Sequence, residues 1–211
     1  MGRKQHRIFI LVLGSLTAIG PFSIDMYLPG FPAIARDLHT DISHVALSLT
    51  SYFIGISFGQ LVYGPLLDRY GRKRPVIVGL LIYIVAAVVC GLSPSIHWLV
   101  AARFLLAIGS CVGIVAARAI VRDLFPVNEI ARIFSTLMLV LGISPIIAPT
   151  VGAYVADIYS WRLIFAVLGG IAILILIAVI RFLPESRPAD ASISLHPVQI
   201  IREYASVAFL K

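Results

Sequence analysis

Charged residues are scarce in this chain. Only 13% of its 211 residues are Asp, Glu, Lys or Arg, whereas about a quarter of an ordinary soluble domain is charged. The mean hydropathy is +1.00. This composition excludes an ordinary soluble domain and places the chain in a lipid bilayer.

The chain also lacks a disulfide framework and the motifs of common enzymes. Its two cysteines, Cys90 and Cys111, fall inside apolar runs, where we expect them to pack as small apolar residues. HExxH, GxSxG and Walker sequences are absent, and no paired carboxylates lie within an apolar run. The five histidines show no metal-ligand spacing. We therefore predict neither an enzyme nor a metal site or cofactor.

Six apolar runs are long enough to cross about 30 Å of hydrocarbon as helices. The alternation typical of a transmembrane barrel is missing from them. The first run follows Arg3, Lys4 and Arg7 and resembles a signal peptide, but Pro21, Asp25 and Pro29 take the place of a cleavage site. The sequence predicts an all-α membrane protein with six transmembrane helices, at residues 8–29, 45–67, 75–93, 98–117, 131–153 and 163–183.

The positive charges are distributed unevenly between the two sides of these helices. With a cytoplasmic N-terminus, 14 of the 17 Lys and Arg residues lie on the inner side. Arg36 and Arg162 lie outside, and Arg103 lies within a span. This asymmetry satisfies the positive-inside rule with both termini in the cytoplasm. Because the cations are divided among short loops, a nucleic-acid partner is not needed to explain the net charge of +7.

An internal repeat divides the chain into two units of three helices, at about 1–93 and 94–187. Ile34-Ala-Arg-Asp-Leu38 at the end of the first span recurs 86 residues later as Ile120-Val-Arg-Asp-Leu124, although so short a match can also arise by chance. Because three is odd, the second unit enters the membrane the other way up. Inverted repeats of this kind are typical of secondary transporters.

The loop after the second span resembles a known transporter signature. Gly64-Pro-Leu-Leu-Asp68-Arg69-Tyr-Gly71-Arg72-Lys73-Arg74 is similar to the loop 2–3 motif of the major facilitator superfamily. Four further stretches narrow the resemblance to the Bcr/CflA-type (bicyclomycin and chloramphenicol resistance) drug:proton antiporters: Asp25-Met-Tyr-Leu-Pro29, Ala117-Arg118-Ala-Ile-Val-Arg122-Asp123-Leu124, Ser144-Pro145-Ile-Ile-Ala148-Pro149-Thr-Val-Gly152 and Leu183-Pro-Glu-Ser186.

Two motifs depart from the family pattern. The span-4 pattern Arg-x-x-Gln-Gly-x-Gly reads Arg103-Phe-Leu-Leu106-Ala107-Ile-Gly109 here, and the span-5 pattern Gly-Pro-x-x-Gly-Gly reads Ala148-Pro149-Thr-Val-Gly152-Ala153. Both changes alter the expected polar lining of a substrate cavity.

The resemblance implies proton-coupled efflux of small-molecule drugs or metabolites across the bacterial cytoplasmic membrane, driven by the proton gradient without a cofactor. Family members carry twelve spans, so residues 1–187 correspond to the N-terminal half and 188–211 to the start of a cytoplasmic linker, with an amphipathic surface helix expected over 194–210. The other half would come from a longer protein, a split reading frame or a second copy. The alternative is a non-transporting membrane subunit or an inactive, truncated remnant of a transporter.

Asp25 is the predicted proton and substrate site. A carboxylate inside a membrane span costs free energy, so its presence there indicates a functional role. Arg103 lies at a similar depth, about 6 to 7.5 Å below the outer surface by helical rise, so the two side chains are expected to face each other, with Arg103 tuning Asp25. The simpler interpretation is that Asp25 is a helix-end residue touched by water.

The family pattern assigns three further groups of residues. The first group is expected to form a cytoplasmic latch: Gly64, Asp68, Arg69, Gly71, Arg72 and Asp123. The alternative is that these residues form a turn that only fixes the topology. The second group, Pro145, Pro149 and Gly152, marks the helix that seals the interface between the two halves of an antiporter. The alternative is that these residues only serve ordinary packing in the bundle. Met26, Tyr27, Tyr52 and Gln60 are candidates for the cavity lining, and otherwise packing residues.

Overall fold

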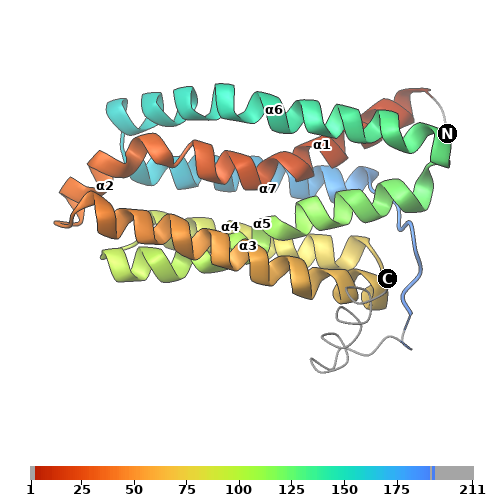
Figure 1. Ribbon diagram of the computed structural model, residues 1–211, viewed down its shortest axis with the longest axis horizontal. Helices are drawn as coiled ribbons and strands as arrows, with labels where there is room; N and C mark the ends of the chain where they lie inside the picture. Colours follow the sequence, from red (N-terminus) through yellow and green to blue (C-terminus); the bar gives the residue numbers. More distant parts are fainter. Residues whose placement is uncertain (1–2, 191, 193–211) are drawn as a thin grey trace, which may run out of the picture.

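Six helical segments long and apolar enough to cross a membrane run back and forth along one axis (Figure 1). The computed structural model describes residues 3–190 and residue 192, and this part of the chain contains helices and no strand. The segments are Ile8–Asp37, Ile42–Tyr70, Lys73–Gly91, Ile96–Leu124, Val127–Ile158 and Trp161–Phe182. The prediction of an all-α protein with six spans is confirmed.

The first span is broken near its outer end. Helix α1 (Arg3–Asp25) stops at Asp25, a short 3₁₀ helix η1 (Leu28–Gly30) follows, and α2 (Phe31–Asp37) completes the span. Pro29 within η1 has no backbone N–H to donate, so the regular α-helical hydrogen-bond ladder cannot continue through this point. The break leaves Asp25 at a helix end inside the span.

The remaining spans are each a single helix: α3 (Ile42–Tyr70), α4 (Lys73–Gly91), α5 (Ile96–Leu124), α6 (Val127–Ile158) and α7 (Trp161–Phe182). Several extend beyond the predicted apolar runs, because helices continue into water when a cap satisfies their first backbone N–H groups. Asp41 accepts from the His44 N–H at 2.8 Å, and Ser95 accepts from the Trp98 N–H at 3.4 Å. Polar caps therefore set helix starts that hydropathy does not detect.

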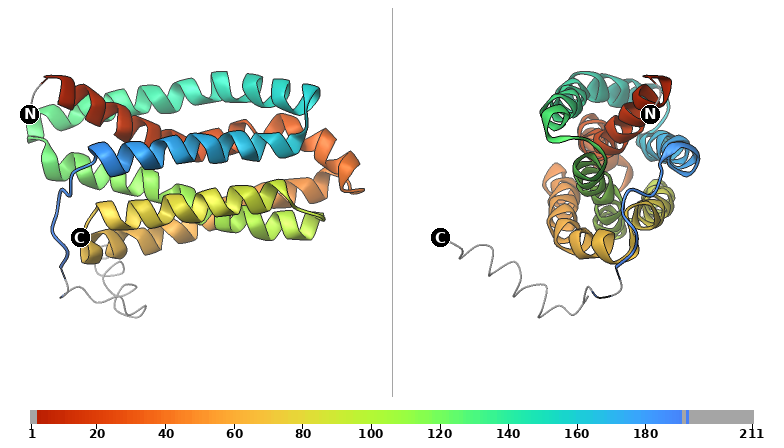
Figure 2. Two further views of the ribbon diagram at one scale, coloured as in Figure 1. Left: turned by 180° about the vertical axis from the view of Figure 1, so that it is seen from behind. Right: turned by 90° about the vertical axis from the view of Figure 1, so that its right-hand side faces the viewer.

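Helices α1 and α5, the first helices of the two predicted repeats, occupy the inside of the bundle (Figure 2). Helix α1 packs against α6 and α7, while α5 packs against α3 and α4. Each inner helix therefore lies mainly among the helices of the other repeat. The repeated Arg-Asp-Leu stretches at the ends of α2 and α5 lie at opposite ends of the bundle (Figure 1), as an inverted repeat requires.

Two glycines allow the inner helices to approach their neighbours closely. A Cβ atom at Gly113 of α5 would lie 2.2 Å from the Leu16 carbonyl oxygen of α1. A Cβ at Gly152 of α6 would lie 2.2 Å from the Met26 carbonyl oxygen just after α1. Small residues at such crossings let membrane helices pack backbone to backbone, so α1 is held between α5 and α6.

The described chain ends at the same end of the bundle at which α1 begins, and we call this end the inner end, following the predicted orientation (Figure 1). The segment after α7 runs across this end, and the Asp190 N–H donates to the Arg69 carbonyl at 3.0 Å. The amphipathic helix predicted over 194–210 lies outside the described residues.

Candidate functional site

Asp25 faces α6 at the point where α1 ends. It is half-buried, and the Ser144 hydroxyl of α6 donates to Asp25 Oδ2 at 3.4 Å. Ser144 itself is fully buried. Of the described Asp and Glu residues, Asp25 is the one that lies more than ten residues from both ends of its span. It is therefore the carboxylate most deeply embedded in the bilayer region.

Arg103 lies in the interior on another side of α1. Its side chain is fully buried, and Nη1 donates to the Ser23 carbonyl at 3.0 Å. The guanidinium carbon lies 4.2 Å from the Tyr27 ring centroid and 4.3 Å from the Tyr52 centroid. Stacking on two aromatic rings stabilises the buried charge. Nε and Nη2 have no hydrogen-bond partner among the described residues.

Asp25 and Arg103, which were expected to face each other, contact different partners in this structure. Among the described residues, neither an ion pair nor a hydrogen bond joins the two side chains; Asp25 contacts Ser144 and Arg103 contacts Ser23. Helical rise placed both groups at one depth, but the rotation of each side chain about its helix axis turns them toward different neighbours. Arg103 instead binds the α1 backbone two residues before Asp25.

Hydrogen bonds tie the aromatic residues around Arg103 into the bundle. The Tyr27 hydroxyl lies 2.6 Å from the Ser48 hydroxyl, and the Tyr52 hydroxyl donates to Ser110 at 2.9 Å. Met26, Tyr27 and Tyr52 were predicted to line a cavity, but all three are fully buried among other side chains. Gln60, the fourth candidate, is exposed on α3. Met26, Tyr27 and Tyr52 thus pack inside this half, whereas Gln60 does not, and the cavity-lining role of the four residues stays a prediction.

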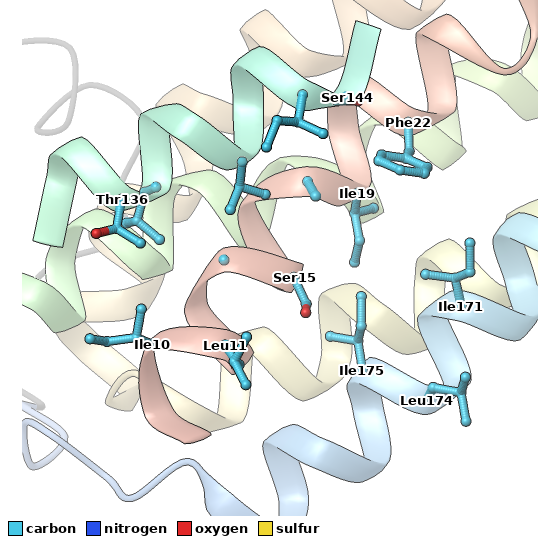
Figure 3. A pocket seen from close by; sticks show the side chains of 15 residues that line it. Ile10, Leu11, Ser15, Ile19, Phe22, Thr136, Ser144, Ile171, Leu174 and Ile175 are labelled. Atoms are coloured by element: carbon cyan, nitrogen blue, oxygen red, sulfur yellow. The ribbon is translucent and has the colours of Figure 1, made fainter. Parts of the chain in front are cut away.

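An apolar cavity of about 550 Å³ lies between α1, α6 and α7 (Figure 3). Ser15 and Thr136 provide hydroxyl groups in a lining that is otherwise aliphatic and aromatic, and Ser144 lies in the same lining (Figure 3). Because Ser144 donates to Asp25, the cavity lies next to the embedded carboxylate. Sequence reasoning missed this cavity, since its lining residues are the same aliphatic types that fill the bundle core.

A charge cluster closes the inner end of the bundle, as the loop motif predicts. Arg72 Nη1 donates to Asp68 at 2.7 Å, and Arg72 Nε donates to Asp123 at 2.7 Å. Burial lowers the pKa of Arg72, but the hydrogen bonds to Asp123 and Asp68, together with the negative charges of these carboxylates, outweigh burial and raise the pKa of Arg72 overall. We call Asp68, Arg72 and Asp123 the inner cluster.

The segment after α7 adds contacts to the inner cluster that sequence reasoning missed. Glu185 accepts from the Arg72 N–H at 2.5 Å and from the Lys73 N–H at 3.2 Å, which satisfies the start of α4. Gly71 has φ +82°, and a Cβ there would lie 2.9 Å from Glu185 Oε2. The loop therefore requires glycine at 71 for both its backbone conformation and its contact with the carboxylate. The only hint of this contact in the sequence is the Leu183-Pro-Glu-Ser186 stretch, which contains Glu185.

The other predicted loop residues lie around the inner cluster. Arg69 lies against the Tyr70 ring, with its guanidinium carbon 5.8 Å from the centroid. Gly64 is half-buried in α3, one turn before Asp68. Arg187 Nη1 lies 3.4 Å from Asp68, and the Ser186 hydroxyl donates to Asp123 at 3.2 Å. The loop and the segment after α7 thus form one polar layer.

A second ion pair, at the outer end, was also missed. Arg162 at the start of α7 pairs with Asp37 at the end of α2, and Trp161 Nε1 donates to Asp37 at 3.0 Å. Asp37 and Asp123 occupy the same place in the two repeated Arg-Asp-Leu stretches. Each therefore joins the end of the first span of one repeat to the start of the third span of the other. We call Asp37, Trp161 and Arg162 the outer cluster.

The predicted antiporter helix α6 is continuous through Pro145 and Pro149. Gly152 is its point of close contact with the Met26 backbone just after α1. Large apolar side chains of α6 are exposed: Met138, Leu139, Ile143, Ile146, Ile147 and Tyr154.

The model of the Major Facilitator Superfamily matches residues 13–205. The chain belongs to this superfamily. The likeness extends to solved structures: a crystal structure of a peptide transporter POT mutant in complex with sulfate gives a TM-score of 0.69 at 18% sequence identity, covering 99% of this chain and 44% of that one. At this identity the likeness shows the fold.

Relatives within the major facilitator superfamily include named resistance proteins. The chain is 39% identical to an uncharacterized transporter, YdgK, of Bacillus subtilis, over 90% of this chain and 48% of the relative. It is 34% identical to a bicyclomycin resistance protein homolog of Haemophilus influenzae, over 96% of this chain and 51% of the relative. It is 36% identical to a chloramphenicol resistance protein of Pseudomonas aeruginosa, over 84% of this chain and 43% of the relative. The family prediction is confirmed, and the chain spans about half the length of the curated relatives it matches.

Proposed function

We propose that this chain forms one half of a proton-coupled efflux transporter for small-molecule drugs or related metabolites. Residues 1–187 act as the six-helix half, and 188–211 begin the linker to a second half. That half is supplied by the same polypeptide, by a separate chain or by a second copy. Two features support the proposal: the relatives named for bicyclomycin and chloramphenicol resistance, and the embedded carboxylate of Asp25 beside an apolar cavity.

Asp25 is the proposed proton and substrate site. A carboxylate inside a span can take up a proton from one side of the membrane and release it to the other, and its negative charge suits a cationic or polar substrate group. Ser144 orients the carboxylate by donating to Oδ2. The adjoining apolar cavity provides surface for the hydrophobic body of a drug, which is how small-molecule sites are usually built.

Arg103 is proposed as a positioning residue for Asp25 and not as its ion-pair partner. Its Nη1 holds the Ser23 carbonyl, two residues before Asp25, and its guanidinium lies between the rings of Tyr27 and Tyr52. These contacts link α3 and α5 to the end of α1 immediately before the break at η1. A change in the packing around Arg103 would therefore shift the backbone that carries the carboxylate.

The inner cluster is proposed to stabilise the state in which the cytoplasmic side is closed. Its ion pairs join α3, the start of α4 and the end of α5 at one end of the bundle. An alternating-access transporter requires two states that differ by only a few kcal/mol, and such a cluster is large enough to bias them. The proposed orientation places both termini and this cluster in the bacterial cytoplasm, consistent with the distribution of Lys and Arg.

The test measures drug-driven proton movement by the whole polypeptide of the natural reading frame. Inside-out membrane vesicles are acidified, and chloramphenicol or bicyclomycin is added while a pH-sensitive dye reports the internal pH. We expect the drug to release protons from vesicles with the wild-type protein and with Asp157→Asn, an exposed carboxylate at the outer end of α6. Asp25→Asn is expected to abolish the release at equal protein abundance.

Two results would contradict the proposal in different ways. Proton release by Asp25→Asn equal to wild type would show that the proton is carried elsewhere. If the wild-type protein releases no protons with any probe drug, the alternative of a non-transporting membrane subunit is favoured. The replacement of the expected glutamine and glycine by Leu106 and Ala107, both fully buried, is the feature that points to that alternative.

A further inference from the structure

A second apolar groove, of about 400 Å³, lies between α3 and α4 at the inner half of the bundle. Both helices pack mainly against α5 and contact each other little, which leaves a groove between them (orange and yellow in Figure 2). Phe58 and Ile82 line its deep end, and Ile108 of α5 lies in its lining. Tyr70 and Arg74 line the end nearest the loop between the two helices. The groove therefore has one apolar end and one cationic end.

The length and position of the groove match one leaflet of a bilayer. The helix from Phe58 to Tyr70 rises about 18 Å at 1.5 Å per residue. Half of a hydrocarbon core of about 30 Å is about 15 Å. The groove therefore extends from the inner membrane surface to about the bilayer midplane, which is the depth of one acyl chain.

Arg74 is the charged residue of the groove and has no carboxylate partner in an ion pair among the described residues. It is exposed, whereas the neighbouring Arg72 is buried and paired with Asp68 and Asp123. Tyr70 is 44% exposed beside it, in the position that aromatic residues favour at a membrane surface. An arginine fork binds a phosphate with two parallel hydrogen bonds.

We propose that this groove binds an anionic phospholipid of the inner leaflet. One acyl chain lies between α3 and α4, and Arg74 binds the phosphate at the membrane surface. The charge at the mouth selects against a purely apolar occupant, and the cytoplasmic leaflet is the one that carries anionic lipid facing polybasic loops. The site differs from the cavity beside Asp25, and it does not depend on the transport proposal.

The test titrates purified protein in detergent with phosphatidylglycerol or with phosphatidylcholine of the same acyl chains, and counts bound lipids by native mass spectrometry. We expect phosphatidylglycerol to bind about fivefold more tightly, the factor for about one cation at a membrane surface. Arg74→Gln is expected to remove this preference. Val78→Trp, which fills the groove from α4, is expected to weaken both lipids by at least about fivefold.

Matched variants keep the test specific. Arg132→Gln removes an exposed inner cation on α6, and Val88→Trp places the same bulk elsewhere on α4; both are expected to leave lipid binding unchanged. Val62→Trp fills the groove from α3 if Val78→Trp does not fold.

Three outcomes would overturn the proposal. The first is equal binding of the two lipids by wild-type protein, or an unchanged preference in Arg74→Gln. The second is displacement of phosphatidylglycerol by equimolar glycerol 3-phosphate, which would identify a site for a soluble phosphate. The third is a protein dimer that Val78→Trp abolishes, which would make the groove an interface between two copies.

Discussion

The inner and outer clusters are expected to differ in their contribution to stability, and the burial of their side chains predicts by how much. The Arg72 side chain is 6% exposed and Asp123 is 19% exposed, whereas Arg162 and Asp37 are 38% and 46% exposed. Removing one partner of a buried ion pair costs about 3–5 kcal/mol, while exposed pairs contribute about 0.2–1 kcal/mol. Because Asp68 still holds Arg72, we expect Asp123→Asn to lower the free energy of unfolding by about 2 kcal/mol and Asp37→Asn by under about 1 kcal/mol.

Thermal unfolding of the purified protein in detergent, followed by circular dichroism, measures this difference. At about 2–4 °C per kcal/mol, Asp123→Asn is expected to lower the midpoint by roughly 4–8 °C and Asp37→Asn by less than roughly 4 °C. Asp157→Asn, an exposed control, should leave the midpoint unchanged. Combining Asp123→Asn with Arg72→Met should cost less than the sum of the single changes, because the pair acts as a unit. A shift for Asp37→Asn as large as that for Asp123→Asn would refute the reasoning from burial.

Three further predictions concern the helix crossing, the buried arginine and a helix cap. Gly152→Leu is expected to lower the unfolding midpoint strongly, since its Cβ would lie 2.2 Å from the Met26 carbonyl just after α1, whereas Gly142→Leu, with nothing within 4 Å, should not. Arg103→Met should leave the midpoint unchanged or raise it, because a buried charge with unsatisfied N–H groups is replaced by an apolar side chain, yet abolish drug-driven proton release. Hydrogen bonds from His44 lower the pKa of Asp41, and the bond from the His44 backbone N–H has the largest effect. The stabilisation from this helix cap is therefore fully present above the unfolded-state pKa of about 3.9 and is lost as the pH falls through the lower folded-state pKa. An NMR titration that follows the Asp41 carboxyl and the His44 amide in parallel would measure the folded-state pKa. A value at or above about 3.9 would contradict the prediction.

The spans, the inner cluster and the family could be predicted from the sequence because each has a local signal. An apolar run of about 20 residues is visible whatever it packs against, and Asp68 near the end of α3 lies only four residues before Arg72, which precedes α4. The partners of Asp25 and Arg103 depend instead on the rotation of α1 and α5 about their axes, which close crossings such as that at Gly113 determine. Depth along a helix follows from residue counting, but the direction in which a side chain points does not.

The two ion-pair clusters follow from the way the repeats interlock. Because α1 packs mainly with α6 and α7 of the other repeat and α5 mainly with α3 and α4, each repeat buries little of the surface of its own first helix. The end of each first span therefore meets the start of the third span of the other repeat, and an Asp and an Arg lie at both meeting points. In the sequence these partners are 51 and 125 residues apart, so only the repeated Arg-Asp-Leu stretch hints at them. The predicted inverted repeat thus accounts for one ion-pair cluster at each end of the bundle, and the more buried inner cluster lies at the end where the segment after α7 adds Glu185 and Arg187 to it.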